Sequence, residues 1–387
     1  MKIIPVQDGV PIKCWADEID AETLKQAKNL AVLEFAFKHI AIMPDCHKGF
    51  GMPIGGVLAA KDAIVPNAVG VDIGCGMRAV RTSIKEIDRQ TIINIIEKIR
   101  DYIPVGFKHH PVPKEWSGFD RAPDIAVIQR ELNSSKRQLG TLGGGNHFIE
   151  IQQDKNTGSL WLMVHSGSRN FGLKIASEFH KLAKKECEKR KILLPDKDLA
   201  FFYFDSKEGR EYYTAMNFAL EFARENRKRM MDVIKEIFAS FTNAKFEEEI
   251  DIHHNYASKE KHFGKEVIVH RKGATAAFKN LKGIIPGSQG SSSFIVEGKG
   301  NQESFMSCSH GAGRRLSRRE ANRILNEQEC EAVMKDIIHE KWHNRFDEAP
   351  QAYKDINIVM AQQKDLVKII YELKPLGVIK GDADLNI

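Results

Sequence analysis

The sequence has no apolar run long enough to cross a membrane. A membrane-spanning helix needs about 18 or more consecutive apolar residues, and the opening segment MKIIPVQDGVPIKCW lacks the apolar core of a secretory signal. We therefore expect a protein that acts in the cytoplasm and has no membrane partner.

Paired cysteines are also missing. The six cysteines are widely spaced and form no Cys-x-x-Cys motif. Because disulfide frameworks are typical of small secreted domains, each cysteine is expected to be a core thiol, a metal ligand or a reactive group.

Two common nucleotide-binding motifs are absent as well. No G-x-x-x-x-G-K-[ST] loop occurs, which disfavours a Walker-type NTPase. The glycine-rich segments lie outside any clear βαβ unit, which disfavours a dinucleotide fold.

The patterns that are present predict an α+β protein. Helical periodicity and short β-like runs alternate without a βαβ rhythm. Helices are expected over 21–37, 86–103, 172–191, 209–240, 317–336 and 356–374, and strands at 57–60, 160–164, 266–270 and 294–296. Ser317 followed by Glu320 predicts a capped helix start.

The chain shows no internal repeat and no long linker, so a single domain over residues 1–387 is the simplest organisation. Within it, residues 112–137 are expected to form a surface excursion. Residues 381–387 are expected to form a polar tail.

The net charge of +6 is compatible with a polyanionic partner. Basic residues cluster at 181–191, 224–229 and 314–319. Solvated helix faces explain the first two clusters equally well. The third follows a histidine in a glycine-rich segment, which gives it more weight.

Histidines and acidic residues recur in glycine-bracketed segments. Gly70, Gly74 and Gly76 surround Asp72 and Cys75, where a tight turn would let a carboxylate and a thiolate meet at one ion. A glycine turn with a buried cysteine is the alternative reading for this segment alone.

Three further segments favour a metal. They contain His147 after a glycine run, His165 at the end of an apolar stretch and the pair His253-His254. Their wide separation excludes a zinc finger and implies a site assembled by the whole fold. Oxygen, nitrogen and sulfur donors together suit manganese or zinc, with enough ligands for two ions.

Two other segments are candidates for phosphate chemistry. Residues 285–293 are rich in small residues and form either a nucleotide cradle or a plain turn. His310 lies between small residues and is followed by arginines, so it is either a nucleophile toward phosphorus or part of a helix cap.

Taken together, these segments resemble the RtcB family of RNA ligases from about Pro44 to Lys380. The motifs that carry the resemblance stand in the family's order: Pro-Asp45-Cys-His47, Gly70-Val-Asp72-Ile-Gly-Cys75-Gly, Gly-Asn146-His147-Phe-Ile-Glu150, His165-Ser-Gly-Ser-Arg169, His254-Asn255, Arg271-Lys-Gly-Ala, Pro286-Gly-Ser288 and Ser309-His310-Gly-Ala-Gly313-Arg314.

The resemblance implies a large catalytic domain with a metal site in a central cleft. It implies that Mn²⁺, two ions per site, is held by Asp72, Cys75, His147, His165 and His254. It implies that His310 is guanylylated by GTP, and that the nucleotide is held by Asn146, Glu150, Ser288, Gly311, Ala312, Gly313, Tyr353 and Lys380. Arg169 and Arg314 would contact RNA phosphates.

The implied reaction joins an RNA 3′-phosphate or 2′,3′-cyclic phosphate to a 5′-hydroxyl, in RNA repair or tRNA splicing. The lysine motif K-x-D-G of ligases that join 5′-phosphates is absent. Two other functions fit the same residues: a metal-dependent phosphoesterase or nuclease, and a non-catalytic RNA-binding protein with a structural metal.

Cys46 departs from the aliphatic residue expected between Asp45 and His47, and it places an oxidisable thiol beside the site. The sequence leaves open the physiological RNA, the oligomeric state, activity on DNA ends and the need for an activating protein.

Overall fold

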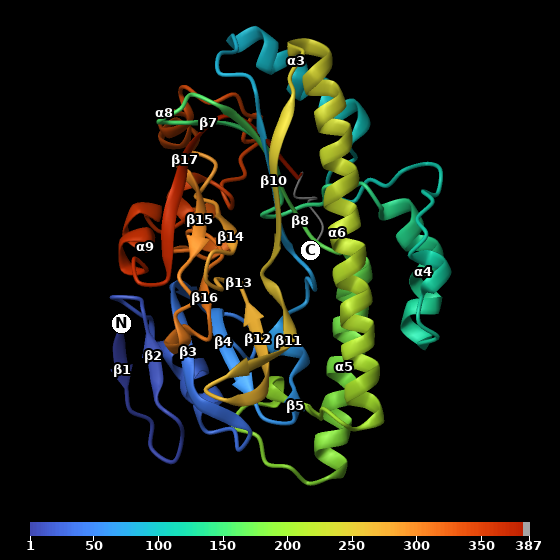
Figure 1. Ribbon diagram of the computed structural model, residues 1–387, viewed down its shortest axis with the longest axis vertical. Helices are drawn as coiled ribbons and strands as arrows, with labels where there is room; N and C mark the ends of the chain where they lie inside the picture. Colours follow the sequence, from blue (N-terminus) through green and yellow to red (C-terminus); the bar gives the residue numbers. More distant parts are fainter. Residues whose placement is uncertain (382–387) are drawn as a thin grey trace.

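Two β-sheets form the centre of the molecule (Figure 1). The computed structural model describes residues 1–381, so the tail expected at 381–387 lies, apart from Gly381, outside the described residues. The first sheet has the strand order β1 (Lys2–Ile4), β2 (Ile12–Cys14), β3 (Ala36–His47), β4 (Ile54–Ala60), β12 (Lys265–Lys272) and β11 (Asn255–His262).

The second sheet has seven strands, and all neighbouring pairs in it are antiparallel. Its order is β10 (Phe246–His253), β6 (Gly76–Thr82), β8 (Leu160–Ser166), β7 (Phe148–Asp154), β17 (Val367–Lys380), β15 (Ser293–Gly298) and β14 (Lys282–Ile285). Two short pairs complete the strands, β13 (Ala274–Ala276) with β16 (Ser307–Ser309) and β5 (Ala63–Ile64) with β9 (Phe202–Tyr203).

A long helix, α6 (Lys207–Thr242), runs along the molecule beside α5 (Arg169–Lys189) and packs against β6 and β8 (Figure 1). The Ser206 side chain caps its start by accepting from the Gly209 N–H, and Asn243 ends it in the left-handed conformation. Met230, Ile234 and Phe238 repeat every four residues on the buried face. The helix therefore gives the seven-stranded sheet a rigid cover.

The remaining α-helices of the described chain are shorter. They are α1 (Ala21–Ala31), α2 (Pro66–Val69), α3 (Arg89–Tyr102), α4 (Ala126–Gln138), α7 (Arg318–Ile324), α8 (Glu327–Met334) and α9 (Ile356–Gln362). The segment 112–137 contains most of α4, which packs on α5 and buries Val127 and Ile128.

The α+β class is confirmed, and each predicted strand lies within an observed strand. Two predicted helices were too long, because α1 and α9 end early and the strands β3 and β17 follow. Residues 36–47 are almost wholly buried, and a continuous apolar run does not distinguish a buried strand from a helix. The helix expected over 317–336 is divided into α7 and α8, whose start is capped by Asn326.

The capped start at Ser317 is confirmed, because its hydroxyl accepts from the Glu320 N–H at 3.2 Å.

Candidate functional site

Strand register gathers five of the candidate residues at one end of the seven-stranded sheet. Gly76, directly after Cys75, pairs with Ser166 on one side and with His253 on the other. Phe148 pairs with both His165 and Lys380. As a result, the ends of β6, β7, β8, β10 and β17 meet at one end of the sheet, although these strands are far apart in the sequence.

The candidate metal ligands converge in a buried cluster there. The Cys75 Sγ lies 3.2 Å from His165 Nε2 and 3.4 Å from His147 Nε2. His165 Nε2 lies 3.4 Å from His254 Nε2, and His147 Nε2 lies 3.0 Å from Asp72 Oδ2. Cys75, His147 and His165 thus have donor atoms within 4.8 Å of one another, and Asp72 and His254 extend the cluster through contacts with His147 and His165.

The histidine rings are oriented by their other nitrogen. His147 Nδ1 lies 3.0 Å from the Leu142 carbonyl, and His165 Nδ1 lies 3.2 Å from the Asn146 carbonyl. A ring that donates from Nδ1 keeps the lone pair of Nε2 for a metal. Burial and the neighbouring histidines hold the pKa of His165 and His254 well below the ordinary value, which favours the neutral ligand form.

Asp72 and Cys75 have opposite pKa shifts. Burial would raise the pKa of Asp72, but the hydrogen bond and charge of His147, with the Arg169 charge, lower it. Burial and the Asp72 carboxylate raise the pKa of the Cys75 thiol well above its usual value. A bound cation would reverse the second shift, because a coordinating thiol is deprotonated.

His310 is held by a buried carboxylate. Its Nδ1 lies 2.7 Å from Asp45 Oδ2, which also accepts the backbone N–H of His310 at 3.1 Å and of Gly311 at 3.3 Å. Burial alone would raise the pKa of Asp45, but the hydrogen bond and charge of His310 lower it. The carboxylate is therefore ionised and fixes the ring, leaving Nε2 without this partner.

The strand pair β13–β16 positions His310 beside the metal-ligand cluster. Ala274 pairs with Ser309, and Ala274 N–H donates to the His254 carbonyl at 3.2 Å. The rings of His254 and His310 consequently lie 4.8 Å apart between centroids.

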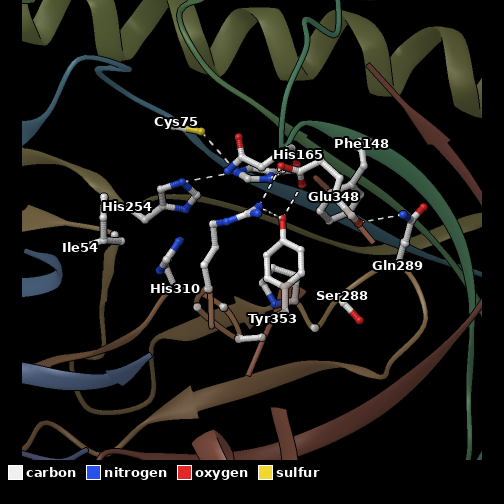
Figure 2. Close-up of a pocket in the computed structure, with 18 of the residues that line it drawn as sticks. Ile54, Cys75, Phe148, His165, His254, Ser288, Gln289, His310, Glu348 and Tyr353 are labelled. Atoms are coloured by element: carbon white, nitrogen blue, oxygen red, sulfur yellow. Dashed lines mark hydrogen bonds and ion pairs between the residues drawn. The ribbon is translucent and has the colours of Figure 1, made fainter. Parts of the chain in front are cut away.

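A cavity of about 260 Å³ connects the cluster with the other candidate residues (Figure 2). The candidates that line it are Asp72, Cys75, Asn146, Glu150, His165, His254, Ser288, His310, Gly311, Ala312, Gly313, Arg314, Tyr353 and Lys380. Burial raises the pKa of Glu150 to about 7, against the opposing effects of Gln152 and Lys380. At physiological pH the neutral and charged forms of this carboxyl group are therefore present in comparable amounts.

Two candidates lie outside the cavity wall. His147 is buried behind Cys75 and Asp72. Arg169 donates to the Thr141 hydroxyl at 3.2 Å and to the Gly106 carbonyl at 3.3 Å. Its guanidinium therefore supports the loops around the cluster.

Glu348 is a cavity residue that the motifs did not single out. Its carboxylate contacts Arg314 at 3.1 Å, Arg318 at 2.8 Å and Lys380 at 3.2 Å, and it accepts the Tyr353 hydroxyl. These cations outweigh burial and lower its pKa to about 2. A buried acid that contacts four side chains has no local sequence signal.

Sequence reasoning also gave no role to Asp45, although it quoted the motif that contains it. Cys46, singled out as a hazard, is buried, and burial raises the pKa of its thiol to about 12. The thiol is therefore kept in the form that is least readily oxidised.

No helix among residues 1–381 is both long and apolar enough to cross a membrane.

Comparisons with known proteins agree over almost the entire chain. The model of the family described as tRNA-splicing ligase RtcB matches residues 26–122 and 114–381. The chain is 40% identical over 401 residues to the RNA-splicing ligase RtcB of Escherichia coli (strain K12), covering 97% of this chain and 98% of the relative.

Two archaeal proteins named tRNA-splicing ligase RtcB are also similar. That of Nanoarchaeum equitans is 34% identical over 461 residues, covering 96% of each chain. That of Thermococcus kodakarensis is 32% identical over 457 residues, covering 96% of this chain and 95% of the relative.

Proposed function

The chain belongs to the RtcB family, and we propose that it is an RNA ligase that joins a 3′-phosphate or 2′,3′-cyclic phosphate end to a 5′-hydroxyl end through a guanylylated His310. The observation that carries this proposal is the pairing of His310 Nδ1 with Asp45 at 2.7 Å. It leaves Nε2 as the nucleophilic nitrogen beside the His254 ring.

The first step forms a phosphorus–nitrogen bond. His310 Nε2 attacks the α-phosphorus of GTP, and the bond to the β-phosphate oxygen breaks to release pyrophosphate. The Asp45 carboxylate stabilises the positive charge that develops on the ring while Nδ1 keeps its proton.

In the second step, an oxygen of the RNA 3′-phosphate attacks the same phosphorus, and the GMP group passes from His310 to the RNA end. In the third step, the 5′-hydroxyl attacks the RNA phosphorus and loses its proton, and GMP leaves. The activation is needed because a phosphomonoester dianion has no good leaving group. A cyclic phosphate is first opened by water to the 3′-phosphate.

In this proposal, residues at one end of the seven-stranded sheet would hold two Mn²⁺ ions. Asp72, Cys75, His147, His165 and His254 supply the mixed donors that suit manganese, and the buried His254 Nδ1 has no hydrogen-bond partner among residues 1–381. Cys75, whose Sγ contacts both His147 and His165, would be a shared ligand in this set. When bound, the ions neutralise charge on the phosphates.

The nucleotide in this proposal lies in the cavity that the metal ligands also line. Asn146, Glu150, Ser288, Tyr353 and Lys380 would hold the guanine nucleotide, with the backbone of 311–313 near its phosphate. Glu150 and Lys380 supply an acceptor and a donor for a purine edge. Arg314, which lines the cavity, is the better placed of the two candidate RNA-phosphate arginines, because Arg169 supports loops.

RNA ends and GTP are the partners that this reaction requires, and we place it in the cytoplasm. Halves of spliced tRNA and cleaved rRNA or tRNA are both substrates of the proposed chemistry.

Labelling with GTP tests the proposal. With GTP labelled at the α-phosphate and Mn²⁺, the wild-type protein should keep a covalent label that survives alkali and is lost in mild acid, as a phosphorus–nitrogen bond requires. His310→Ala should carry no label. His343→Ala, which removes an exposed histidine outside the cavity, should label normally.

A joining assay then separates ligase from phosphoesterase. RNAs that end in a 3′-phosphate, a cyclic phosphate or a 3′-hydroxyl are incubated with 5′-hydroxyl RNA, with and without GTP. Joining of the first two only, and only with GTP, supports the proposal. Loss of the phosphate without GTP and without joining would contradict it, as would a label that persists in His310→Ala.

A further inference from the structure

The turn at residues 105–110 presents an exposed aromatic ring close to the metal-ligand cluster. Phe107 keeps 63% of its surface exposed. Lys108 and His109, which follow it, are exposed as well. An apolar ring of this size on a surface turn is unusual, because exposure loses the free energy that burial would provide.

The backbone of the turn is fixed to the site. Gly106 N–H donates to the Gly143 carbonyl at 2.9 Å, and Arg169 donates to the Gly106 carbonyl at 3.3 Å. Gly143 has a φ of +94°, and a Cβ there would lie 2.0 Å from the Arg169 guanidinium. This positive φ strongly favours glycine, and the two hydrogen bonds tie the turn to the loop that leads into His147.

Basic residues follow the ring in the sequence and lie at the neighbouring end of α4. The segment 110–114 runs beside the end of α4: His110 N–H donates to the Arg137 carbonyl at 3.0 Å, and Lys114 N–H donates to the Lys136 carbonyl at 2.9 Å. These backbone contacts bring the end of α4, with Lys136 and Arg137, next to the segment that follows Lys108, and Glu115 is the single acidic residue in the segment 103–117. The chain beside the exposed ring is therefore predominantly basic.

We propose that the Phe107 turn is a docking platform for the RNA strand that ends in the phosphate: an unpaired base near that end stacks on Phe107, and the backbone phosphates contact Lys108 and Arg137. This inference rests on the proposed function. Aromatic rings with basic neighbours bind single strands in this manner, because every base has a stacking face and every linkage a charge.

An unpaired strand is the form that fits. In an A-form duplex the bases are stacked on one another and cannot cover a protruding ring. Because the turn is anchored to Arg169 and Gly143, a base on Phe107 would set the position of the terminal phosphate relative to the ligand cluster.

Binding of a short unpaired RNA with a 3′-phosphate tests the platform. Fluorescence anisotropy with catalytically silent protein, prepared without GTP, measures the dissociation constant directly. Phe107→Ala should weaken binding by about tenfold or more, and Phe107→Trp should restore it. The control is Phe241→Ala, which removes another exposed phenylalanine, on α6. Arg229 of α6 packs near Gly140, and Phe241 lies twelve residues, or about 18 Å, farther along the helix.

RNAs with one abasic nucleotide near the 3′ end identify stacking. With the abasic nucleotide at one particular position, the RNA should bind wild-type protein as weakly as it binds Phe107→Ala. A purely structural role for the ring would not produce this dependence on position. Unchanged RNA affinity in Phe107→Ala overturns the proposal, and so does an equal loss of affinity with every abasic RNA.

The labelling reaction of His310 needs no RNA, so it tests the site separately. Phe107→Ala should label at the wild-type rate, and loss of labelling would assign the turn to support of the metal site instead. If wild type fails to label yet binds RNA through Phe107, the proposed function fails and the platform stands.

Discussion

Glu150 shows how burial sets the charge of a single residue. Its carboxyl accepts a hydrogen bond from the Gln152 side-chain amide at 2.5 Å, and burial raises its pKa to about 7. In the unfolded chain the group ionises near its ordinary pKa. Between the two pKa values the folded protein binds a proton that the unfolded chain has lost, so stability falls as pH rises through this interval.

We therefore predict that the free energy of unfolding of Glu150→Gln increases relative to that of wild type as pH rises. The gain should develop between about pH 4.5 and pH 7, reach at most about 3 kcal/mol and stay constant at higher pH. Denaturant unfolding of metal-free protein, measured across this range, checks it. Glu97→Gln, on the exposed face of α3, should show no such trend, and a parallel trend in both variants would contradict the explanation.

At the scale of the element, helix α6 supports the candidate metal ligands. Its fully buried Arg227 donates to the carbonyls of Gly74 at 2.9 Å and Ser166 at 3.0 Å, and it pairs with Asp251. It also lies 3.2 Å from His253 Nδ1. One guanidinium thus holds the backbone next to Cys75 and next to His165, and it contacts the side chain of His253 next to His254.

Arg227→Lys should accordingly weaken Mn²⁺ binding by about 10- to 100-fold, because lysine cannot reproduce the planar fork of hydrogen bonds. Calorimetric titration of the apoprotein with Mn²⁺ measures this directly. Arg224→Lys, an exposed change one turn away on the same helix, is the control and should bind normally. Wild-type affinity in a folded Arg227→Lys would show that α6 does not support the site.

At the scale of the whole molecule, the site joins the two sheets. β10 of the seven-stranded sheet continues through His254 into β11 of the six-stranded sheet, and Asp45 of β3 holds His310. A structure whose sheets share these buried contacts should unfold as one unit, in keeping with a single domain.

Hydrogen exchange in increasing denaturant tests this prediction. Amides of β4 and β8, one strand from each sheet, should exchange at the same denaturant concentration, and Mn²⁺ should shift both to higher concentration together. Earlier exchange of β4, or a shift by Mn²⁺ confined to β8, would indicate two separately stable parts.

Much of the fold was predictable because the helix and strand patterns are local. Residues 209–240 carry a helical period that α6 confirms, and all four strand candidates lie in strands. The errors fell at 32–37 and 363–374, where apolar residues belong to the approaches and starts of strands, and at 317–336, where one expected helix is two. Periodicity cannot decide such cases, since the choice depends on what packs against the segment.

The sequence by itself determined the family, the set of glycine-bracketed donors and the identity of His310 as the candidate nucleophile, because motif order and residue type are properties of the chain. Only the tertiary structure decided how these residues act together. Antiparallel register brought Cys75, His165 and His254 within reach of one another, and burial made Asp45, Glu348 and Arg227 into their supports. Such supports are set by contacts between residues distant in sequence and by desolvation, and neither is encoded in any local pattern.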